Sequence, residues 1–219
     1  MNQTAENYLK GLHALSERFP KGVTTNALAE HLSTKASSIT DMLKKLHEKG
    51  LVKHEKYQGT VLTAKGKKIA LQVVRKHRLW EVFLVEKLHF GWDQVHEIAE
   101  QLEHIQSTEL VDRLSEFLGH PRFDPHGDPI PDAKGNFLEE KVVLLSAVNT
   151  HQKMLLRGVK DHSTAFLQHL KKLGLVPGQK FQLLHRMEYD GTCEVQLHGS
   201  KEKIQISQLT ADNLICVAL

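Results

Sequence analysis

Cysteine, long apolar runs and targeting signals are all scarce in this chain. Its only two cysteines, Cys193 and Cys216, lie far apart without a Cys-x-x-Cys spacing. This excludes a disulfide framework and a cysteine-rich zinc site, and it fits a reducing compartment. No apolar run approaches the about 18 residues of a membrane-spanning helix, and the N-terminus lacks the pattern of a signal peptide. We therefore expect a cytoplasmic protein without a membrane partner.

Charge is unevenly distributed along the chain, although the net charge is only +3. Residues 1–76 contain 14 Lys and Arg against 6 Asp and Glu, whereas residues 77–148 contain 6 against 14. The first segment therefore carries a net charge of +8 and the second a net charge of −8. A basic segment suits contact with phosphate groups, and an acidic segment suits cations.

The first third of the chain has the element order of a winged helix-turn-helix. Apolar residues at helical spacing predict a helix up to Pro20, a second one through Leu32 and a third one that ends before Gly50. Residues 51–62 predict a two-stranded hairpin with its turn at Gln58-Gly59. Three helices followed by a hairpin indicate a DNA-binding domain over residues 1–73.

The third of these helices is the predicted DNA-reading element. In a helix-turn-helix the exposed side of this helix enters the major groove. Short polar side chains near its start can contact base edges, and the surrounding lysines can contact phosphates. Use of the winged helix for protein contact alone is the alternative. The candidate DNA-binding residues are Lys35, Ser37, Ser38, Thr40, Asp41, Lys44 and Lys45.

Histidine and glutamate recur at helical spacing in the acidic middle of the chain. The patterns are His77-x-x-x-Glu81 and His96-x-x-x-Glu100-x-x-Glu103-His104. Residues three or four apart share a helix face, so these imidazoles and carboxylates can form a cage for one or two divalent cations. Nitrogen and carboxylate ligands without thiolate suit Mn²⁺ or Fe²⁺, with Zn²⁺ as a competitor. The remaining histidines are scattered and are interpreted as structural or surface residues.

Three other interpretations of these patterns stay open. The first is a solvated polar helix face without metal. The second is a dinuclear metallohydrolase, but no obvious general base follows His104, and the chain has no P-loop, His-Glu-x-x-His pair or Ser-His-Asp arrangement. The third is a constitutive DNA-binding protein with a structural metal. We do not expect an enzyme, because a metal cage joined to a DNA-binding domain favours a protein whose DNA binding is controlled by metal.

The rest of the chain is predicted to form one helical and one β-rich part. Helices are expected over residues 64–88, 96–104 and 109–118 and near 139–146, with a proline-rich strap at 121–131. Apolar surface at Leu79, Trp80, Phe83 and Leu84 predicts a dimer interface. Short alternating strands after Gly178 predict a five-stranded SH3-like barrel. The expected fold is mainly α with a C-terminal β part: a helical dimerisation and metal-binding domain over 74–148, a linker over 149–160 and the SH3-like domain over 161–219.

Five motifs together resemble the diphtheria-toxin-repressor family of metal-dependent transcriptional repressors, which includes the manganese transport regulators. The resemblance covers nearly the whole chain and implies a homodimeric repressor that binds a double-stranded DNA operator of metal-uptake genes. It also implies a winged helix, a helical metal and dimer domain and an optional SH3-like domain. The motifs are Ala29-Glu30-x-Leu32, Leu62-Thr63-x-x-Gly66, Arg75-Lys76-His77-Arg78-Leu79-x-Glu81, Val95-His96 through Glu103-His104, and His126-Gly127-x-Pro129-Ile130-Pro131.

The resemblance also implies how the metal ligands are grouped. His77, Glu81 and His96 match one metal site, while Glu100, Glu103 and His104 match a second that Asn7 completes. Iron-responsive members place Cys at the position of Glu100, so this carboxylate points to Mn²⁺, with Fe²⁺ as the alternative.

Some positions of the chain depart from the family pattern. Asn7 stands where iron-responsive members place Met and manganese-responsive members Asp, and Lys10 stands where the latter have a second acidic ligand. Ligands that some members draw from the SH3-like domain fall on Ser163 and Phe166, so this contribution is absent or moved to Asp161 or His162.

Overall fold

The computed structural model describes residues 2–55 and 59–219. The chain divides into two compact units, and the boundary between them falls inside one long helix, after His77. The first unit comprises residues 1–77, 100–114 and 131–137, and the second comprises residues 78–99, 115–130 and 138–219. None of the helices in the described ranges has the length and apolar character needed to cross a bilayer.

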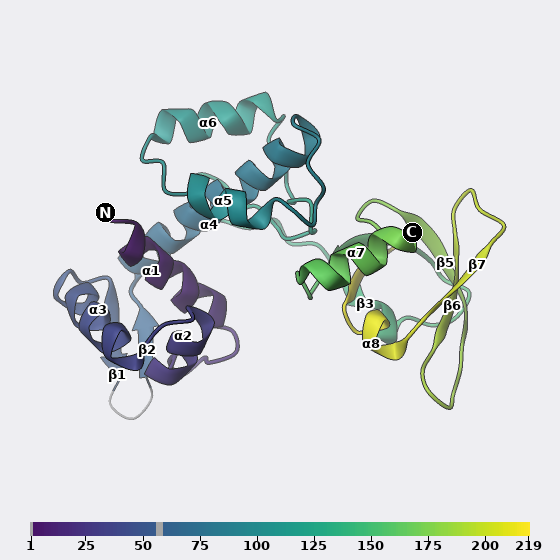
Figure 1. The fold of residues 1–219 in the computed structure, drawn as a ribbon, viewed down its shortest axis with the longest axis horizontal. Helices are drawn as coiled ribbons and strands as arrows, with labels where there is room; N and C mark the ends of the chain where they lie inside the picture. Colours follow the sequence, from purple (N-terminus) through teal and green to yellow (C-terminus); the bar gives the residue numbers. More distant parts are fainter. Residues whose placement is uncertain (1, 56–58) are drawn as a thin grey trace. The chain divides into compact units, whose positions relative to one another are not determined.

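The first unit begins with three helices and an antiparallel hairpin (Figure 1). Asn2 and Thr24 cap the first two helices by accepting hydrogen bonds from backbone N–H groups. Gly50 follows the third helix with a φ of 66°, a conformation that favours glycine. The winged helix-turn-helix prediction is thereby confirmed, while the turn expected at Gln58 lies outside the described residues. The elements are α1 (Gln3–Leu15), α2 (Thr25–His31), α3 (Ala36–Glu48), β1 (Val52–Glu55) and β2 (Gly59–Leu62).

One apolar core holds these three helices together. Leu9 of α1, Leu28 of α2 and Ile39 of α3 are fully buried in the same cluster. Because Ile39, Leu43 and Leu46 recur at helical spacing, α3 buries one face and leaves the other exposed. The exposed face is therefore available for DNA, and α1 is packed firmly against the helices that carry it.

Three further helices follow the hairpin. The helix α4 (Ala64–Glu86) is continuous across the unit boundary, and α5 (His96–Leu102) and α6 (Thr108–Phe117) come after it. Helix α5 is shorter than the predicted helix over 96–104, because the chain turns at its end and Ile105 N–H donates to the carbonyl of Leu102 at 3.2 Å. Glu103 and His104 therefore lie in the turn that leaves α5.

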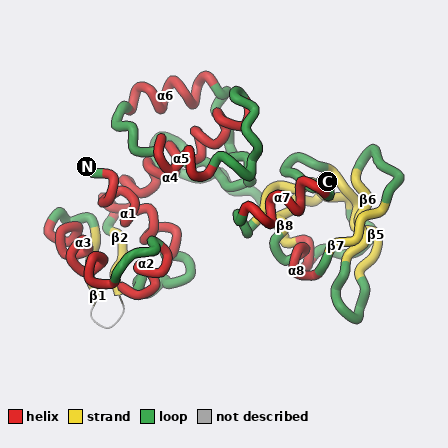
Figure 2. The backbone as a smooth tube through the Cα atoms, in the orientation of Figure 1, coloured by secondary structure: helices red, strands yellow, loops and turns green. Residues whose placement is uncertain are grey.

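The second unit contains a six-stranded antiparallel sheet in the order β3-β8-β4-β5-β6-β7. Figure 2 shows the strands of this unit in yellow. Its central core includes Met154, Leu156, Leu183 and Val195, which are fully buried. Trp92, from the loop before α5, packs into the same core. The elements are β3 (Val143–Leu144), η1 (Leu145–Ala147), β4 (Lys153–Val159), α7 (Thr164–Lys172), β5 (Lys180–Arg186), β6 (Cys193–Leu197), β7 (Lys203–Ile206), α8 (Gln208–Ala211) and β8 (Leu214–Ala218).

Two segments of this unit differ from the sequence-based expectation. The helix expected near 139–146 is absent from the described structure, where Val143 and Leu144 pair with β8 and a single 3₁₀ turn follows. The β-branched Val142 and Val143 favour this extended backbone. The segment expected as a linker, 149–160, contains β4, which pairs with both β5 and β8. The strand count is therefore six, one more than predicted.

Candidate metal centre

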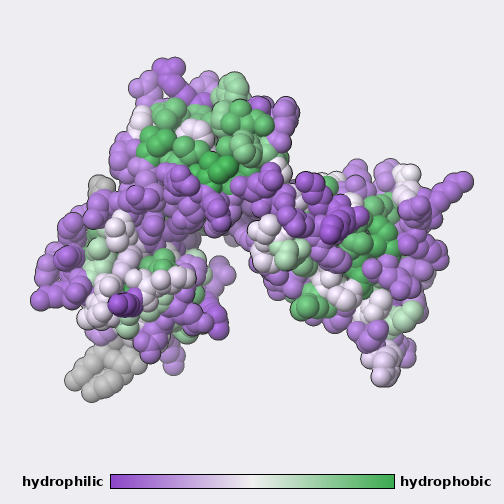
Figure 3. Space-filling view, viewed as in Figure 1, coloured by the Kyte–Doolittle hydropathy of each residue, from purple (hydrophilic) through white to green (hydrophobic). Residues whose placement is uncertain are grey.

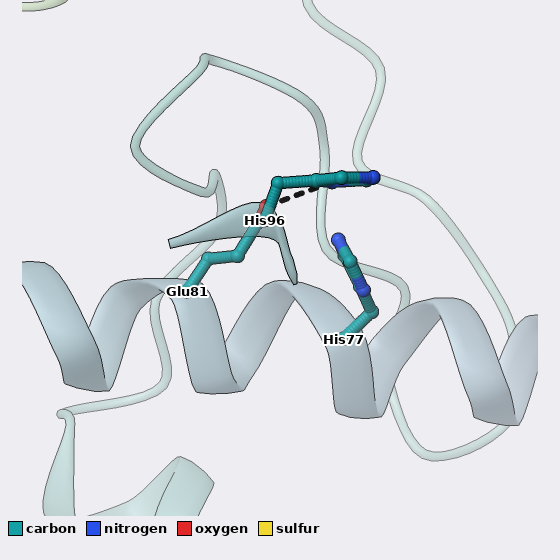
Figure 4. A group of neighbouring side chains, drawn as sticks. All are labelled: His77, Glu81 and His96. Atoms are coloured by element: carbon teal, nitrogen blue, oxygen red, sulfur yellow. Dashed lines mark ion pairs between the residues drawn. The ribbon is translucent and has the colours of Figure 1, made fainter. Parts of the chain in front are cut away.

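The first group of predicted ligands lies on α4 and at the start of α5. His77 precedes Glu81 by one helical turn on α4, and His96 is the first residue of α5 (Figure 4). His96 Nδ1 lies 3.6 Å from Glu81 Oε1, and one ligand atom of each of the three residues lies within 4.8 Å of the others. His77 and Glu81 are buried, whereas His96 is exposed. Two imidazoles and a carboxylate at this spacing form a set that suits a divalent metal.

Three residues predicted for the second group each have a buried polar atom with no hydrogen-bond partner in the described part of the chain. The three atoms are Asn7 Oδ1 on α1, Glu103 Oε1 and His104 Nε2. Glu103 Oε1 and His104 Nε2 lie 3.7 Å apart. Leaving one such atom buried and unpaired costs about 1–3 kcal/mol, so each of the three needs an explanation. All three are lone-pair donors of the kind that bind Mn²⁺ or Fe²⁺, and these residues therefore fit a metal ion.

Glu6, which sequence reasoning missed, orients His104. Glu6 Oε2 lies 2.7 Å from His104 Nδ1, and Gln106 Nε2 donates to Glu6 Oε1 at 2.9 Å. The Glu6 carboxylate is only 3% exposed, so these contacts replace water. An Nδ1–H that donates to a carboxylate leaves the lone pair on Nε2, and this is the tautomer that can bind a metal. Glu6 thereby orients His104, one of the predicted ligands.

His77 is oriented in the same way by Glu103. His77 Nδ1 lies 2.6 Å from Glu103 Oε2. A proton on Nδ1 would donate to Glu103, and this carboxylate thereby orients the His77 ring. Glu103 thus serves as a predicted ligand through one oxygen and as the support of a second ligand through the other.

Lys10 of α1 occupies the space beside Glu100, Glu103 and His77. Its Nζ lies 2.5 Å from Glu100 Oε1, 2.6 Å from Glu103 Oε2 and 3.2 Å from His77 Nδ1. Those three partners could by themselves hold a metal ion, since one ligand atom of each lies within 4.8 Å of the others. The structure therefore places a side-chain ammonium where the carboxylates converge.

A third group, also missed from sequence, joins Glu81 with Asp124 and His126 of the proline-rich strap. One ligand atom of each lies within 4.8 Å of the others, and all three residues are buried. His126 Nε2 lies 2.8 Å from the Trp92 carbonyl, and Nδ1 lies 3.6 Å from Glu81 Oε2. The interpretation of His126 as a structural or surface residue overlooked this cluster. The sequence did contain a hint of this cluster: His126 begins the His126–Pro131 motif and follows the acidic Asp124 by two residues.

The electrostatics of this third group are those of a buried acid–base cluster. Burial by itself lowers the pKa of His126, but Glu81, Asp124 and the Trp92 carbonyl outweigh it and raise the pKa to about 9. Burial, followed by the charges of Asp128 and Glu81, raises the pKa of Asp124 to about 7. Both shifts favour the protonated form: His126 is held as a cation beside the carboxylates, and Asp124 takes up a proton more readily than an exposed carboxylate.

The two candidate contributors from the SH3-like domain differ in their surroundings. The ring of His162 stacks on the ring of His126, with 5.0 Å between centroids. Asp161 Oδ1 accepts a hydrogen bond from the Ser163 N–H at the start of α7, and the Ser163 hydroxyl caps that helix. His162 therefore lies next to the third group, and Ser163 has a structural role.

The predicted DNA-binding residues are all exposed and lie at the N-terminal end and along the solvent side of α3. The Thr40 hydroxyl donates to the Ala36 carbonyl at 3.0 Å, and the residue is exposed. Lys44 and Lys45 follow on the same helix, so short polar groups and positive charges share one surface. This is the arrangement expected for base and phosphate contacts.

Large apolar side chains remain exposed beside the end of α4. Phe117 is 65% exposed and its ring lies 6.4 Å from that of Phe83, which in turn lies 5.7 Å from the ring of Trp80. Leu88 and Phe90 add exposed apolar surface. Hydrophobic side chains also gather around α6 in the space-filling view (Figure 3). An apolar patch of this kind marks an interaction surface.

Comparisons with known proteins connect all these regions to one family. Residues 1–60 match the model of the iron-dependent repressor N-terminal DNA-binding domain. Residues 63–132 match the model of the iron-dependent repressor metal-binding and dimerisation domain, and residues 143–217 match the FeoA domain. The three matches follow the order of the winged helix, the helical part and the β-rich part.

Individual relatives include both iron and manganese regulators. The chain is 37% identical over 118 residues to an uncharacterised HTH-type transcriptional regulator of Methanocaldococcus jannaschii, which covers 54% of this chain and 94% of the relative. It is 34% identical over 130 residues to the iron-dependent repressor IdeR of Mycobacterium leprae, which covers 58% of this chain and 55% of that repressor.

Among solved structures, a manganese-dependent transcriptional repressor in complex with manganese matches over 98% of this chain and 100% of its own. The TM-score is 0.83 and the sequence identity is 32%. A match of this extent confirms the resemblance inferred from the motifs. The chain belongs to the diphtheria-toxin-repressor family of iron-dependent and manganese-dependent repressors.

Proposed function

We propose that this protein is a metal-dependent transcriptional repressor that binds double-stranded operator DNA as a homodimer, in the cytoplasm, and controls metal-uptake genes. The observation that carries the proposal is the set of unpaired atoms on Asn7, Glu103 and His104. Asn7 belongs to α1 of the winged helix, whereas Glu103 and His104 follow α5. A cation held by these atoms would tie the DNA-binding helices to the metal-binding segment.

The packing of α1 explains how such a tie reaches the DNA. Leu9 and Leu12 of α1 share a core with Leu28 of α2 and Ile39 of α3, so these helices move together. Glu6 and Lys10, which flank Asn7 on α1, already contact His104 and Glu103. When bound, the metal supplies positive charge that these lone pairs otherwise lack. Fixing α1 then fixes the position of α3, the reading helix.

Thermodynamics limits what this tie can accomplish. A ligand shifts a conformational equilibrium only by the difference between its affinities for the two states. Changing a 1:99 population into 99:1 needs an affinity ratio of about 10⁴. Glu6 and Lys10 also hold α1 to the segment after α5, so the metal shares the restraint of α1 with these protein contacts.

The donor set favours Mn²⁺, with Fe²⁺ as the alternative and Zn²⁺ as an ion that can substitute in vitro. Every candidate ligand is a nitrogen or an oxygen, and both cysteines are buried in the β-rich unit. Carboxylates at Glu100 and Glu103 suit a hard cation, whereas a thiolate would favour softer metals. The amide of Asn7 contributes an oxygen without a charge, which leaves metal preference open to the experiment below.

The homodimer is supported by the apolar surface beside the end of α4. Trp80, Phe83 and Phe117 form one aromatic group on this surface, and Phe117 is mostly exposed. Burying such a group against a second copy removes apolar area from water. Two α3 helices in one dimer would then read two half-sites of an operator.

Binding of DNA with and without metal tests the proposal. A duplex is first selected from a randomised library in the presence of Mn²⁺, and its affinity is then measured by fluorescence anisotropy with Mn²⁺, Fe²⁺ under anaerobic conditions, Zn²⁺ or chelator. Binding that is lost with chelator supports a metal-dependent repressor. Equal binding in chelator would instead identify a constitutive DNA-binding protein, and phosphoester hydrolysis without DNA selection would identify a metallohydrolase.

A further inference from the structure

The Lys10 ammonium lies between Glu100 and Glu103, where a second metal ion would have to bind if this centre held two adjacent ions. Three of its neighbours, Glu100, Glu103 and His77, form a group with metal-ligand spacing. The ammonium lies 2.5 Å from Glu100 Oε1 and 2.6 Å from Glu103 Oε2, so it forms a close ion pair with both carboxylates. The Lys10 side chain is 20% exposed and that of Glu103 is fully buried. The group already contains a cation, and this cation belongs to the chain.

The two oxygens of the Glu103 carboxylate have different surroundings: Oε2 lies near Lys10 and His77, and Oε1 lies near His104. Its Oε2 faces Lys10 and His77, at 2.6 Å from each. Its Oε1 has no hydrogen-bond partner among the described residues and lies 3.7 Å from His104 Nε2. One side of this carboxylate is thus satisfied by protein groups, and the other side is left with unused lone pairs.

We propose that the Lys10 ammonium acts as a tethered cation that takes the place of a second metal ion between Glu100 and Glu103. This centre then accepts one divalent ion, on the side of Glu103 Oε1 and His104 Nε2. The inference rests on the proposed function in that it takes this cluster as a metal centre. A divalent ion on the other side would face an ammonium at close range and would have to displace it from both carboxylates.

If Lys10 replaces the second ion, the protein responds to the binding of a single metal ion at this centre. In a centre with two adjacent ions, binding of the first influences binding of the second through the shared carboxylates. A fixed ammonium removes that step, since its charge is present at every metal concentration. Lys10 also supplies part of the neutralisation that Glu100 and Glu103 need before metal arrives.

Removing the ammonium should create the missing site. In Lys10→Glu a carboxylate replaces the cation, and in Lys10→Gln a neutral amide of similar length does so. Lys10→Arg keeps the charge, and Lys21→Gln removes an exposed charge from the turn after α1. Bound Mn²⁺ per chain is measured by equilibrium dialysis with elemental analysis, and electron paramagnetic resonance reports whether two ions lie close together.

We expect Lys10→Glu to bind one more Mn²⁺ per chain than the wild type. The added ion would share carboxylates with the first at about 3.5–4 Å, as in two-metal sites, and the pair would give an exchange-coupled spectrum. Lys10→Gln should show the same gain at higher Mn²⁺ concentration. Lys10→Arg and Lys21→Gln should keep the stoichiometry and the uncoupled spectrum of the wild type.

The wild type alone also tests the inference, independently of how the variants fold. Anomalous scattering from Mn²⁺-loaded wild-type crystals should give a single peak beside Glu103. Two peaks there, or a coupled wild-type spectrum, would overturn the inference while leaving the metal centre in place. No gain of Mn²⁺ in folded Lys10→Glu and Lys10→Gln would overturn it as well. Absence of any Mn²⁺ near Glu103 in the wild type would instead contradict the proposed function.

Discussion

Replacement of Glu6 by glutamine tests whether the tautomer of His104 controls metal affinity. Gln106 Nε2 is held by two acceptors, Glu6 Oε1 at 2.9 Å and the His104 carbonyl at 2.9 Å, so its donor stays directed at residue 6. In Glu6→Gln the new amide oxygen should pair with this donor, which turns the amide nitrogen toward His104 Nδ1. Nδ1 must then accept, and the proton moves to Nε2, the atom that should bind the metal.

The expected loss of Mn²⁺ affinity in Glu6→Gln can be estimated from the role of residues that hydrogen-bond to metal ligands. Loss of a hydrogen-bond partner that orients a metal ligand typically weakens metal affinity about 10–100-fold. This corresponds to roughly 1.4–2.7 kcal/mol of binding free energy. Glu6 also brings a negative charge near the centre, so the upper half of this range is expected. Since Glu6 is 3% exposed, water cannot replace it as the partner of Nδ1.

The assay is competition for Mn²⁺ with a fluorescent chelator, followed by titration of DNA binding with Mn²⁺. Glu109→Gln is the matched control, because Glu109 carries the same charge but pairs with Arg113 on the exposed side of α6. The control should keep wild-type Mn²⁺ affinity. Thermal unfolding without metal shows whether Glu6→Gln remains folded. A folded Glu6→Gln protein that binds Mn²⁺ within twofold of the wild type would refute the tautomer argument.

Three further predictions concern the centre and the reading helix. Glu103→Gln or His104→Ala should abolish metal-dependent DNA binding, measured by anisotropy at saturating Mn²⁺, and unchanged operator affinity would contradict the switch. Lys44→Ala or Lys45→Ala should lower the slope of log affinity against log salt by about one unit each, and a wild-type slope would show that the reading face is assigned wrongly. Asn7→Asp should tighten Mn²⁺ binding and Asn7→Met should shift preference toward Fe²⁺, so identical metal profiles for all three proteins would remove residue 7 from the ligand set.

Local patterns in the sequence were sufficient for most of the helices. In α3, Ile39, Leu43 and Leu46 recur at helical spacing and are buried, as the periodicity indicates. The short β3 could not be recognised, because an apolar run such as Val142–Leu145 fits a strand and a buried helix equally well. The strand β4 was predicted as a linker because the charged Lys153 and Arg157 lower its apolar content. Its partner strands, β5 and β8, come later in the chain, so no local pattern indicates the pairing.

The same distinction between local and long-range information applies to the site. His77 and Glu81 are one turn apart, so their shared face could be predicted from spacing alone. Lys10 and Glu103 are separated by 93 residues, and Glu6 and His104 by 98. Such contacts depend on how α1 packs in its unit, and no local pattern encodes them. The cluster of Glu81 with His126 was missed for the same reason.

Glu103 shows why ligands and structural residues cannot be separated at this centre. Its carboxylate is fully buried, and it is the partner of Lys10, the support of His77 and the neighbour of His104 Nε2. Removing its charge would leave the partly buried Lys10 ammonium with Glu100 as its remaining carboxylate partner, and the loss of one side of a close ion pair is costly. Glu103→Gln should therefore lower the stability of the metal-free protein as well as its metal affinity. His104→Ala should cost less stability, because the buried Glu6 carboxylate keeps Gln106 as a donor. The thermal unfolding of the two metal-free variants separates these roles, since equal unfolding temperatures would mean that Lys10 does not depend on Glu103.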